Sequence, residues 1–100
     1  SIIKKKIFVK KINKMNKKID LIKIDTNGFE LSVIEGIIHI IKRDKPVLIV
    51  ELNKDEKKIE KLLKKFSYKV YYYSTSGKKL TYGKKGYSIN QYYLQKNHLI

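Results

Sequence analysis

Two acidic residues come directly after short apolar runs of the chain. Asp25 follows residues 19–24, and Glu51 follows residues 47–50. A carboxylate in such a place can orient or deprotonate an acceptor hydroxyl, or hold a divalent metal ion. It can equally be a solvated acid at the end of a strand. The residues leave both roles open for Asp25 and favour a loop acid for Glu51, so Asp25 is the first candidate for chemistry.

Two polar residues follow Asp25 at a spacing that is typical of a helix start. Asn27 and Glu30 are three residues apart and stand ahead of an apolar periodic segment. This is capping-box spacing, in which the first side chain accepts an unpaired backbone N–H and the glutamate reaches back to another. Gly28 between them suits a tight turn. We therefore expect Asn27 to be an N-cap and Glu30 a capping residue, beside Asp25.

The surrounding pattern predicts alternating strands and helices. Residues 19–24 and 47–50 are short, apolar and β-branched, which favours buried strands. Residues 29–42 and 53–66 each carry an apolar stripe at helical spacing, the second behind another capping-box pair, Asn53 and Glu56. This alternation predicts an α/β fold with a parallel sheet. In open α/β sheets ligands bind beyond the carboxyl ends of the strands, where Asp25 and Glu51 would lie.

The two ends of the chain add further strands. Residues 68–73 and 91–95 read as strands, with a short extended piece at 80–82, and the last strand must pair antiparallel because no helix precedes it. Ile7, Val9 and Ile12 suggest an edge strand within residues 1–13, followed by a loop at 13–18. The segments 74–77 and 83–86 read as loops. His39 has no second ligand at metal spacing and His98 lies near the end of the chain, so no metal site is predicted.

A family resemblance becomes specific at the central turn. The run IKIDTNGFE at residues 22–30, followed by Val33, Ile34, Gly36 and then PVLIVE at 46–51, resembles the motifs of the FkbM family of S-adenosylmethionine-dependent methyltransferases. In that family the fourth strand reads like IKIDxEGxE and the fifth like Pro-V-I-x-x-E, and the resemblance spans roughly residues 19–94. Asn27 stands where the family usually has Glu, and Ile12-Asn13 where it often has Leu-Asp.

The resemblance implies an enzyme that transfers a methyl group from S-adenosylmethionine to an oxygen, on a sugar or a small metabolite. Asp25, Asn27 and Glu30 are the candidate catalytic residues that it implies. It also implies that residues 1–100 are a partial domain, strands four to seven of a Rossmann-like class I methyltransferase sheet, with 1–18 as a lead-in. The glycine-rich turn that holds such a cofactor is not in this sequence. We therefore expect an N-terminal half of the same domain as partner, and no activity from this chain alone; a degenerate, non-catalytic remnant is the alternative.

Composition suggests one competing function. A formal charge of +15 favours nucleic acid or another polyanion, and tyrosines interleaved with lysines can stack on bases. However, Arg43 is the only arginine, and arginine is the usual reader of bases and phosphates. Absent alanine and sixteen isoleucines point to codon bias, so we rank a nucleic-acid-binding module third and favour packing roles for the tyrosines. Without cysteine or an apolar membrane segment, we expect a cytoplasmic chain with no membrane span.

Overall fold

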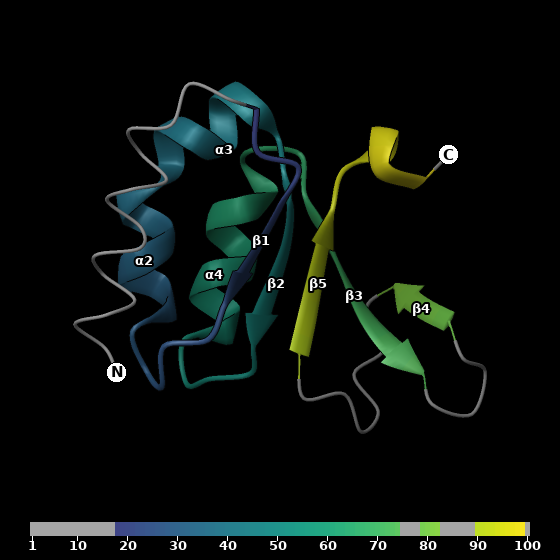
Figure 1. Cartoon of the computed structure of the whole chain (residues 1–100). Helices are drawn as coiled ribbons and strands as arrows, with labels where there is room; N and C mark the ends of the chain where they lie inside the picture. Colours follow the sequence, from purple (N-terminus) through teal and green to yellow (C-terminus); the bar gives the residue numbers. More distant parts are fainter. Residues whose placement is uncertain (1–17, 75–78, 83–89, 100) are drawn as a thin grey trace.

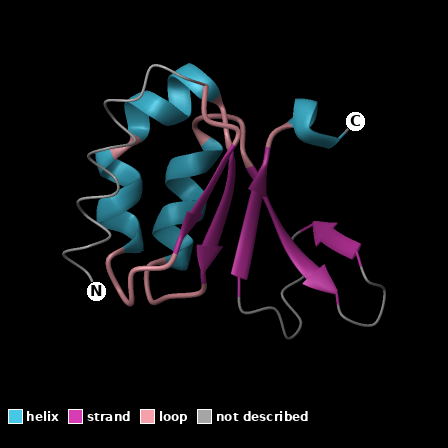
Figure 2. Ribbon diagram, viewed as in Figure 1, coloured by secondary structure: helices cyan, strands magenta, loops and turns pink. Residues whose placement is uncertain are grey.

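The computed structural model describes residues 18–74, 79–82 and 90–99, which form an α/β fold (Figures 1 and 2). In chain order the elements are β1 (Leu21–Ile24), α2 (Glu30–Gly36), α3 (Ile38–Asp44), β2 (Val47–Glu51), α4 (Glu56–Lys64), β3 (Lys69–Ser74), β4 (Lys79–Tyr82), β5 (Asn90–Leu94) and the 3₁₀ turn η1 (Lys96–Leu99). None of the helices in this part of the chain is long and apolar enough to cross a membrane.

The strands form one mixed sheet in the order β1-β2-β5-β3-β4. Only β1 and β2 are parallel neighbours, while β2–β5, β5–β3 and β3–β4 are antiparallel. The expected α/β fold is therefore confirmed, but the mainly parallel sheet is shown only in part, because a single pair of neighbouring strands is parallel. The physical reason is the place of β5: it lies between β2 and β3, so these two strands run in the same direction without pairing with each other. The expectation that the last strand is antiparallel is confirmed.

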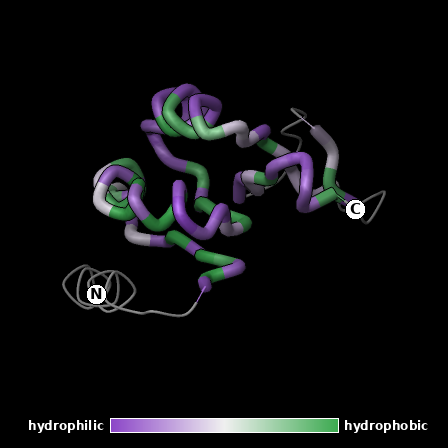
Figure 3. The backbone as a smooth tube through the Cα atoms, turned by 90° about the horizontal axis from the view of Figure 1, so that it is seen from above, coloured by the Kyte–Doolittle hydropathy of each residue, from purple (hydrophilic) through white to green (hydrophobic). Residues whose placement is uncertain are grey.

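The helices cover one face of the sheet (Figures 1 and 3). Burial alternates along β1 and β2, because every second side chain points to the helices. The core consists of apolar side chains from both layers: Ile22, Ile24, Val33, Ile34, Ile37, Ile40, Ile41, Leu48, Val50, Ile59, Leu63, Tyr68, Val70, Tyr72 and Tyr93. The predicted helical stripes are thus largely confirmed, and the tyrosines within the described residues divide between core and rim as expected.

The helix expected over residues 29–42 is divided in two. Ile37 has φ −114° and ψ 17°, which ends α2 and precedes α3. Its N–H donates to the carbonyl of Ile34 at 3.1 Å, one residue tighter than an α-helical bond. Gly36 stands directly before this break and is exposed, with open space where a Cβ would lie. Close packing on a strand therefore does not offset the cost of this glycine.

Several expectations concern residues outside the described part of the chain. They are the edge strand within residues 1–13, the pair Ile12-Asn13, the greater part of the loop at 13–18, the loop at 83–86 and the side chain of Tyr87. In the cluster 74–77, Ser74 closes β3 and the remaining residues lie outside as well.

Candidate active site

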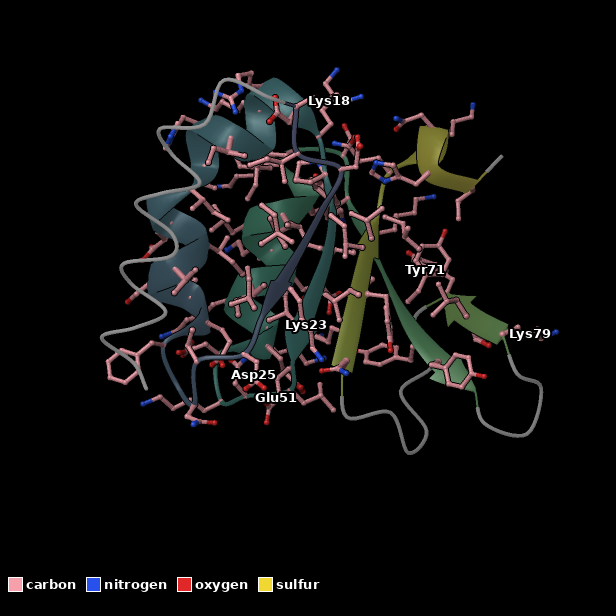
Figure 4. The ribbon with its side chains drawn as sticks, in the orientation of Figure 1. Lys18, Lys23, Asp25, Glu51, Tyr71 and Lys79 are labelled. Atoms are coloured by element: carbon pink, nitrogen blue, oxygen red, sulfur yellow. The ribbon has the colours of Figure 1, made fainter. Side chains whose placement is uncertain are left out.

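The parallel pairing of β1 and β2 brings the two candidate carboxylates to one edge of the sheet. Ile24 is in register with Val50, so Asp25 and Glu51 are the next residues on neighbouring strands. Figure 4 shows Asp25 and Glu51 at this same edge. On its other side Glu51 is in register with Asn90 of β5. Asp25, Glu51 and Asn90 thus form a polar row at the carboxyl ends of β1 and β2, and all three are half-buried.

The turn after β1 is held by the carboxylate of Glu30. Its Oε2 accepts the backbone N–H of Thr26 at 2.7 Å, and its Oε1 accepts the backbone N–H of Gly28 at 3.0 Å. The residue is only 2% exposed, so these bonds compensate for the water that the carboxylate loses. Glu30 is the first residue of α2, and it ties that helix to the turn which begins at Asp25.

Asn27 does not take the role that its spacing predicts. The N-cap of α2 is Phe29, which makes no side-chain cap hydrogen bond, so the prediction of an Asn27 N-cap is wrong. Asn27 instead has a left-handed backbone with φ 54°, a conformation that asparagine adopts more readily than most residues. The next residue, Gly28, has φ 106°. Asn27 and Gly28 therefore both belong to the turn, and Asn27 does not occupy the N-cap position that a capping box requires.

A second polar residue holds the turn after β2. Asn53 accepts the N–H of Asp55 through Oδ1 at 2.8 Å and donates through Nδ2 to the carbonyl of Glu51 at 2.8 Å. The N-cap of α4 is Asp55, again without a side-chain cap bond, so the second capping box is also wrong. The side chain of Asn53 nevertheless links Glu51 to the start of α4, and thereby fixes the backbone on the Glu51 side of the site.

Thr26 contributes a feature that the sequence did not reveal. It is 4% exposed, and its Oγ1 has no hydrogen-bond partner within the described residues. A buried hydroxyl without a partner costs about 1–3 kcal/mol. Thr26 directly follows Asp25, so this unpaired buried hydroxyl lies next to the candidate site. A threonine in a β-branched run reads simply as a strand residue, and no pattern in the sequence could have identified it.

The two histidines lie away from this edge. His39 is exposed on α3. His98 accepts the N–H of Gln95 through Nδ1 at 2.8 Å, so its Nε2 carries the hydrogen that it donates to the carbonyl of Lys45, also at 2.8 Å. It therefore fastens η1 to the end of α3. No group of three or more histidines, cysteines or acids in the described residues is placed to hold a metal ion.

The described residues do not by themselves fit the binding of a nucleotide-type cofactor. Such a cofactor rests on a glycine-rich turn, where the absence of Cβ atoms allows the backbone to approach it. The two glycines that the structure describes are Gly28, in the turn after β1, and Gly36, at the end of α2, and neither belongs to such a motif. What this edge offers is a pair of carboxylates, Asp25 and Glu51, on neighbouring parallel strands.

Comparison with known proteins identifies the family. The family model described as the methyltransferase FkbM domain matches residues 6–73, which is more than half of the chain and includes the turn from Asp25 to Glu30 together with β2. Searches of the curated proteins and of the solved structures gave no significant match. The length of the family match shows that the chain belongs to the FkbM methyltransferase domain family.

Proposed function

We propose that this chain forms part of an enzyme that methylates a hydroxyl group of a sugar or a small metabolite, with S-adenosylmethionine as methyl donor. Membership of a methyltransferase family supports the donor in general terms. The single structural observation that supports the chemistry is the register of β1 and β2, which places Asp25 beside Glu51 at the carboxyl ends of two parallel strands.

In this proposal Asp25 is the catalytic residue. S-adenosylmethionine, held by the part of the domain outside the described residues, would supply the methyl group. The carboxylate of Asp25 would orient the acceptor hydroxyl and take up its proton. Glu51, on the neighbouring strand, hydrogen-bonds a second hydroxyl of the acceptor.

Glu30 and Asn27 are positioning residues in the same proposal. Both oxygens of Glu30 are already engaged by the N–H groups of Thr26 and Gly28, so its carboxylate sets the place of Asp25. Asn27 is exposed on the same turn and faces the solvent from which an acceptor enters.

The cofactor is held, in our proposal, by a segment outside residues 1–100 that belongs to the same domain. Among the described residues, β1 pairs only with β2, so its other edge is not covered by them. Leu21 on β1 is 57% exposed on the face of the sheet opposite to the buried Ile22, which leaves room for further elements of the domain beside β1. The carboxyl half of a Rossmann-like sheet would have such an edge, where further strands add.

Binding of S-adenosylmethionine to the full-length protein tests this proposal. Calorimetric titration is expected to show one site, and incubation with labelled donor and a panel of sugars and hydroxylated metabolites is expected to label one acceptor class. Glu35→Gln, a change at an exposed acid of α2, serves as the matched control and should behave like the unaltered protein. Absence of donor binding by the full-length protein would sink the enzymatic proposal.

A second candidate is a non-catalytic remnant of the same fold. The observation in its favour is Asn27, which stands where members of the family usually have Glu. It predicts that the full-length protein labels no acceptor even if it binds donor, whereas the enzymatic proposal predicts both donor binding and labelling of an acceptor. If donor binds but no acceptor is labelled, the variant Asn27→Glu decides between them, because restored transfer would mark the asparagine as the inactivating change.

A further inference from the structure

The C-terminal part of the chain has a charge and aromatic content of its own. Residues 61–100 contain nine lysines and no aspartate or glutamate, and they hold all eight tyrosines of the protein. All nine acidic residues, including those of the candidate active site, precede them. Strands β3, β4 and β5 and the turn η1 therefore form the basic, tyrosine-rich end of the sheet.

Tyrosines gather on the face of β3 and β4 opposite to that of the buried Tyr72. Tyr71 is in register with Tyr82, and Tyr73 with Leu80, while Tyr72 between them is buried against the core. The rings of Tyr71 and Tyr82 lie 5.6 Å apart, centre to centre, with an angle of 56° between their planes. Tyr82 is 61% exposed and Tyr73 41%. The two strands thus present aromatic surface to solvent.

A cleft of about 600 Å³ lies beside this tyrosine pair, bordered by α4, β3, the end of β4 and η1. Tyr71 and Tyr82 line it together with Lys64, Lys69 and Lys96, and Glu60 is the only acid among its described lining residues. The Nζ of Lys69 lies 5.5 Å from the centre of the Tyr82 ring. Figure 4 shows Tyr71 between η1 and β4. We refer to this hollow as the tyrosine cleft.

The tyrosine cleft is separate from the Asp25 edge. Lys69 is in register with Leu94 at the end of β5, whereas Glu51 is in register with Asn90 at its beginning. A ligand in the cleft therefore lies toward the opposite end of β5 from the candidate active site.

We propose that the tyrosine cleft binds single-stranded nucleic acid. Its chemistry has the two parts that such a ligand needs: aromatic faces on which bases stack, and cations beside them that neutralise phosphates. A lipid surface fits less well, because the cleft is concave and its exposed rings alternate with ammonium groups. Binding is independent of base identity, because bidentate readout of base edges favours arginine. The guanidinium of the only arginine, Arg43, is held by Asp44 through two hydrogen bonds of 2.7 and 2.9 Å.

Fluorescence anisotropy of a labelled oligothymidylate of about 12 nucleotides with the full-length protein tests the proposal. Binding is expected at low salt. The logarithm of the affinity is expected to fall with the logarithm of the salt concentration with a slope of about −2, which corresponds to three phosphates on a single strand. Tyr82→Leu should weaken binding roughly 5- to 150-fold, the range for loss of one stacked base, and Tyr82→Phe should retain it.

The lysine variants provide the matched comparison. Lys69→Gln should make the salt slope shallower by about 0.7, because one phosphate contact is lost. Lys57→Gln removes the same charge from an exposed position of α4 outside the cleft and should leave both the slope and the effect of Tyr82→Leu unchanged. Circular dichroism of each variant verifies that the exposed substitutions leave the fold intact.

Four results would overturn the proposal. They are absence of oligonucleotide binding at low salt, equal binding by Tyr82→Leu and the unaltered protein, tighter binding of duplex than of single strand, and binding of thymidine monophosphate as tight as that of the oligomer. Vesicles of phosphatidylglycerol are the remaining comparison: if they bind with the same dependence on Tyr82 while the oligonucleotide does not bind, the cleft faces a lipid surface instead.

Discussion

The carboxylate of Glu30 accepts the backbone N–H of Thr26 at 2.7 Å, and this bond joins the first residue of α2 to the turn that follows β1. Because Thr26 is the neighbour of Asp25, the same bond fixes the backbone on which the candidate catalytic carboxylate stands. The buried, doubly bonded Glu30 is therefore both a stability element and a positioning element.

Replacement of Glu30 tests its part in stability. Glu30→Ala is expected to lower the free energy of unfolding by about 1–3 kcal/mol, because it leaves the buried N–H of Thr26 and the partly buried N–H of Gly28 without an acceptor. Glu30→Gln should cost less, since the amide oxygen still accepts one of them. Urea unfolding followed by circular dichroism measures both, with Glu35→Ala on the exposed side of α2 as control. Equal stability of Glu30→Ala and Glu35→Ala would contradict this role.

Asp44, at the end of α3, makes the stability of the protein depend on pH through its bond to the backbone just before β1. The guanidinium of Arg43 and the backbone N–H of Ile19 hydrogen-bond its carboxylate and lower its pKa from 3.8 to about 2. Because the folded-state pKa is the lower one, its contribution is fully present above about pH 4 and is lost as the pH falls toward 2.

The urea midpoint of the unaltered protein should therefore exceed that of Asp44→Asn by a constant amount above about pH 5, and the gap should narrow between pH 4 and 2. Asp20→Asn, at a side chain that is 84% exposed at the same end of β1, is the control and should show a much smaller gap. A gap for Asp44→Asn that stays constant down to pH 2 would disprove the linkage.

The two described glycines are expected to respond oppositely to alanine. Gly36→Ala should stabilise the protein by about 0.5–1 kcal/mol, because the position is helical and nothing lies within 4 Å of the added Cβ. Gly28→Ala should destabilise it by about 1–2 kcal/mol, because φ is +106° although the space is equally open. Thermal unfolding of both variants measures the pair, and effects of the same sign would contradict the backbone argument.

Gln91 is expected to stabilise the sheet by linking two buried tyrosine hydroxyls. It is fully buried, donates to the hydroxyl of Tyr72 at 2.9 Å and accepts from the hydroxyl of Tyr93 at 2.9 Å. Gln91→Leu should cost about 2–4 kcal/mol, because two buried hydroxyls lose their partner.

Adding Tyr72→Phe and Tyr93→Phe to that variant should restore part of the loss, because the unpaired hydroxyls are then absent. A double-mutant cycle in urea would show this as a coupling energy on the order of 1 kcal/mol. Strictly additive effects would mean that the three side chains do not act as a network.

The sequence predicted the elements of this fold better than their arrangement. The apolar runs before Asp25 and Glu51 predicted β1 and β2, because short runs of apolar, β-branched residues favour buried strands. The insertion of β5 between β2 and β3 was not predicted, because strand order depends on contacts between segments that are far apart in the sequence. The break at Ile37 also escaped prediction, since the apolar stripe continues across it.

The candidate site was predicted in its place but not in its local geometry. The position of Asp25 beside Glu51 follows from strand ends and parallel pairing, which a sequence can indicate. The spacing of Asn27 and Glu30 suggested a capping box, yet the same two residue types also suit a left-handed turn residue and a buried acceptor. The positive φ at Asn27 and the burial of Glu30 decide which of these roles each residue takes. Neither property can be predicted from the spacing of the two residues.

Methyl transfer by the variant Asp25→Asn in the full-length protein tests the central claim most directly. The proposal predicts that S-adenosylmethionine binds with unchanged affinity while kcat falls by about 10²- to 10⁴-fold, the usual contribution of a general base. Raising the pH should not rescue this variant, since the amide cannot accept the proton. An Asp25→Asn variant that transfers methyl groups as fast as the unaltered protein would contradict the proposed role of this edge of the sheet.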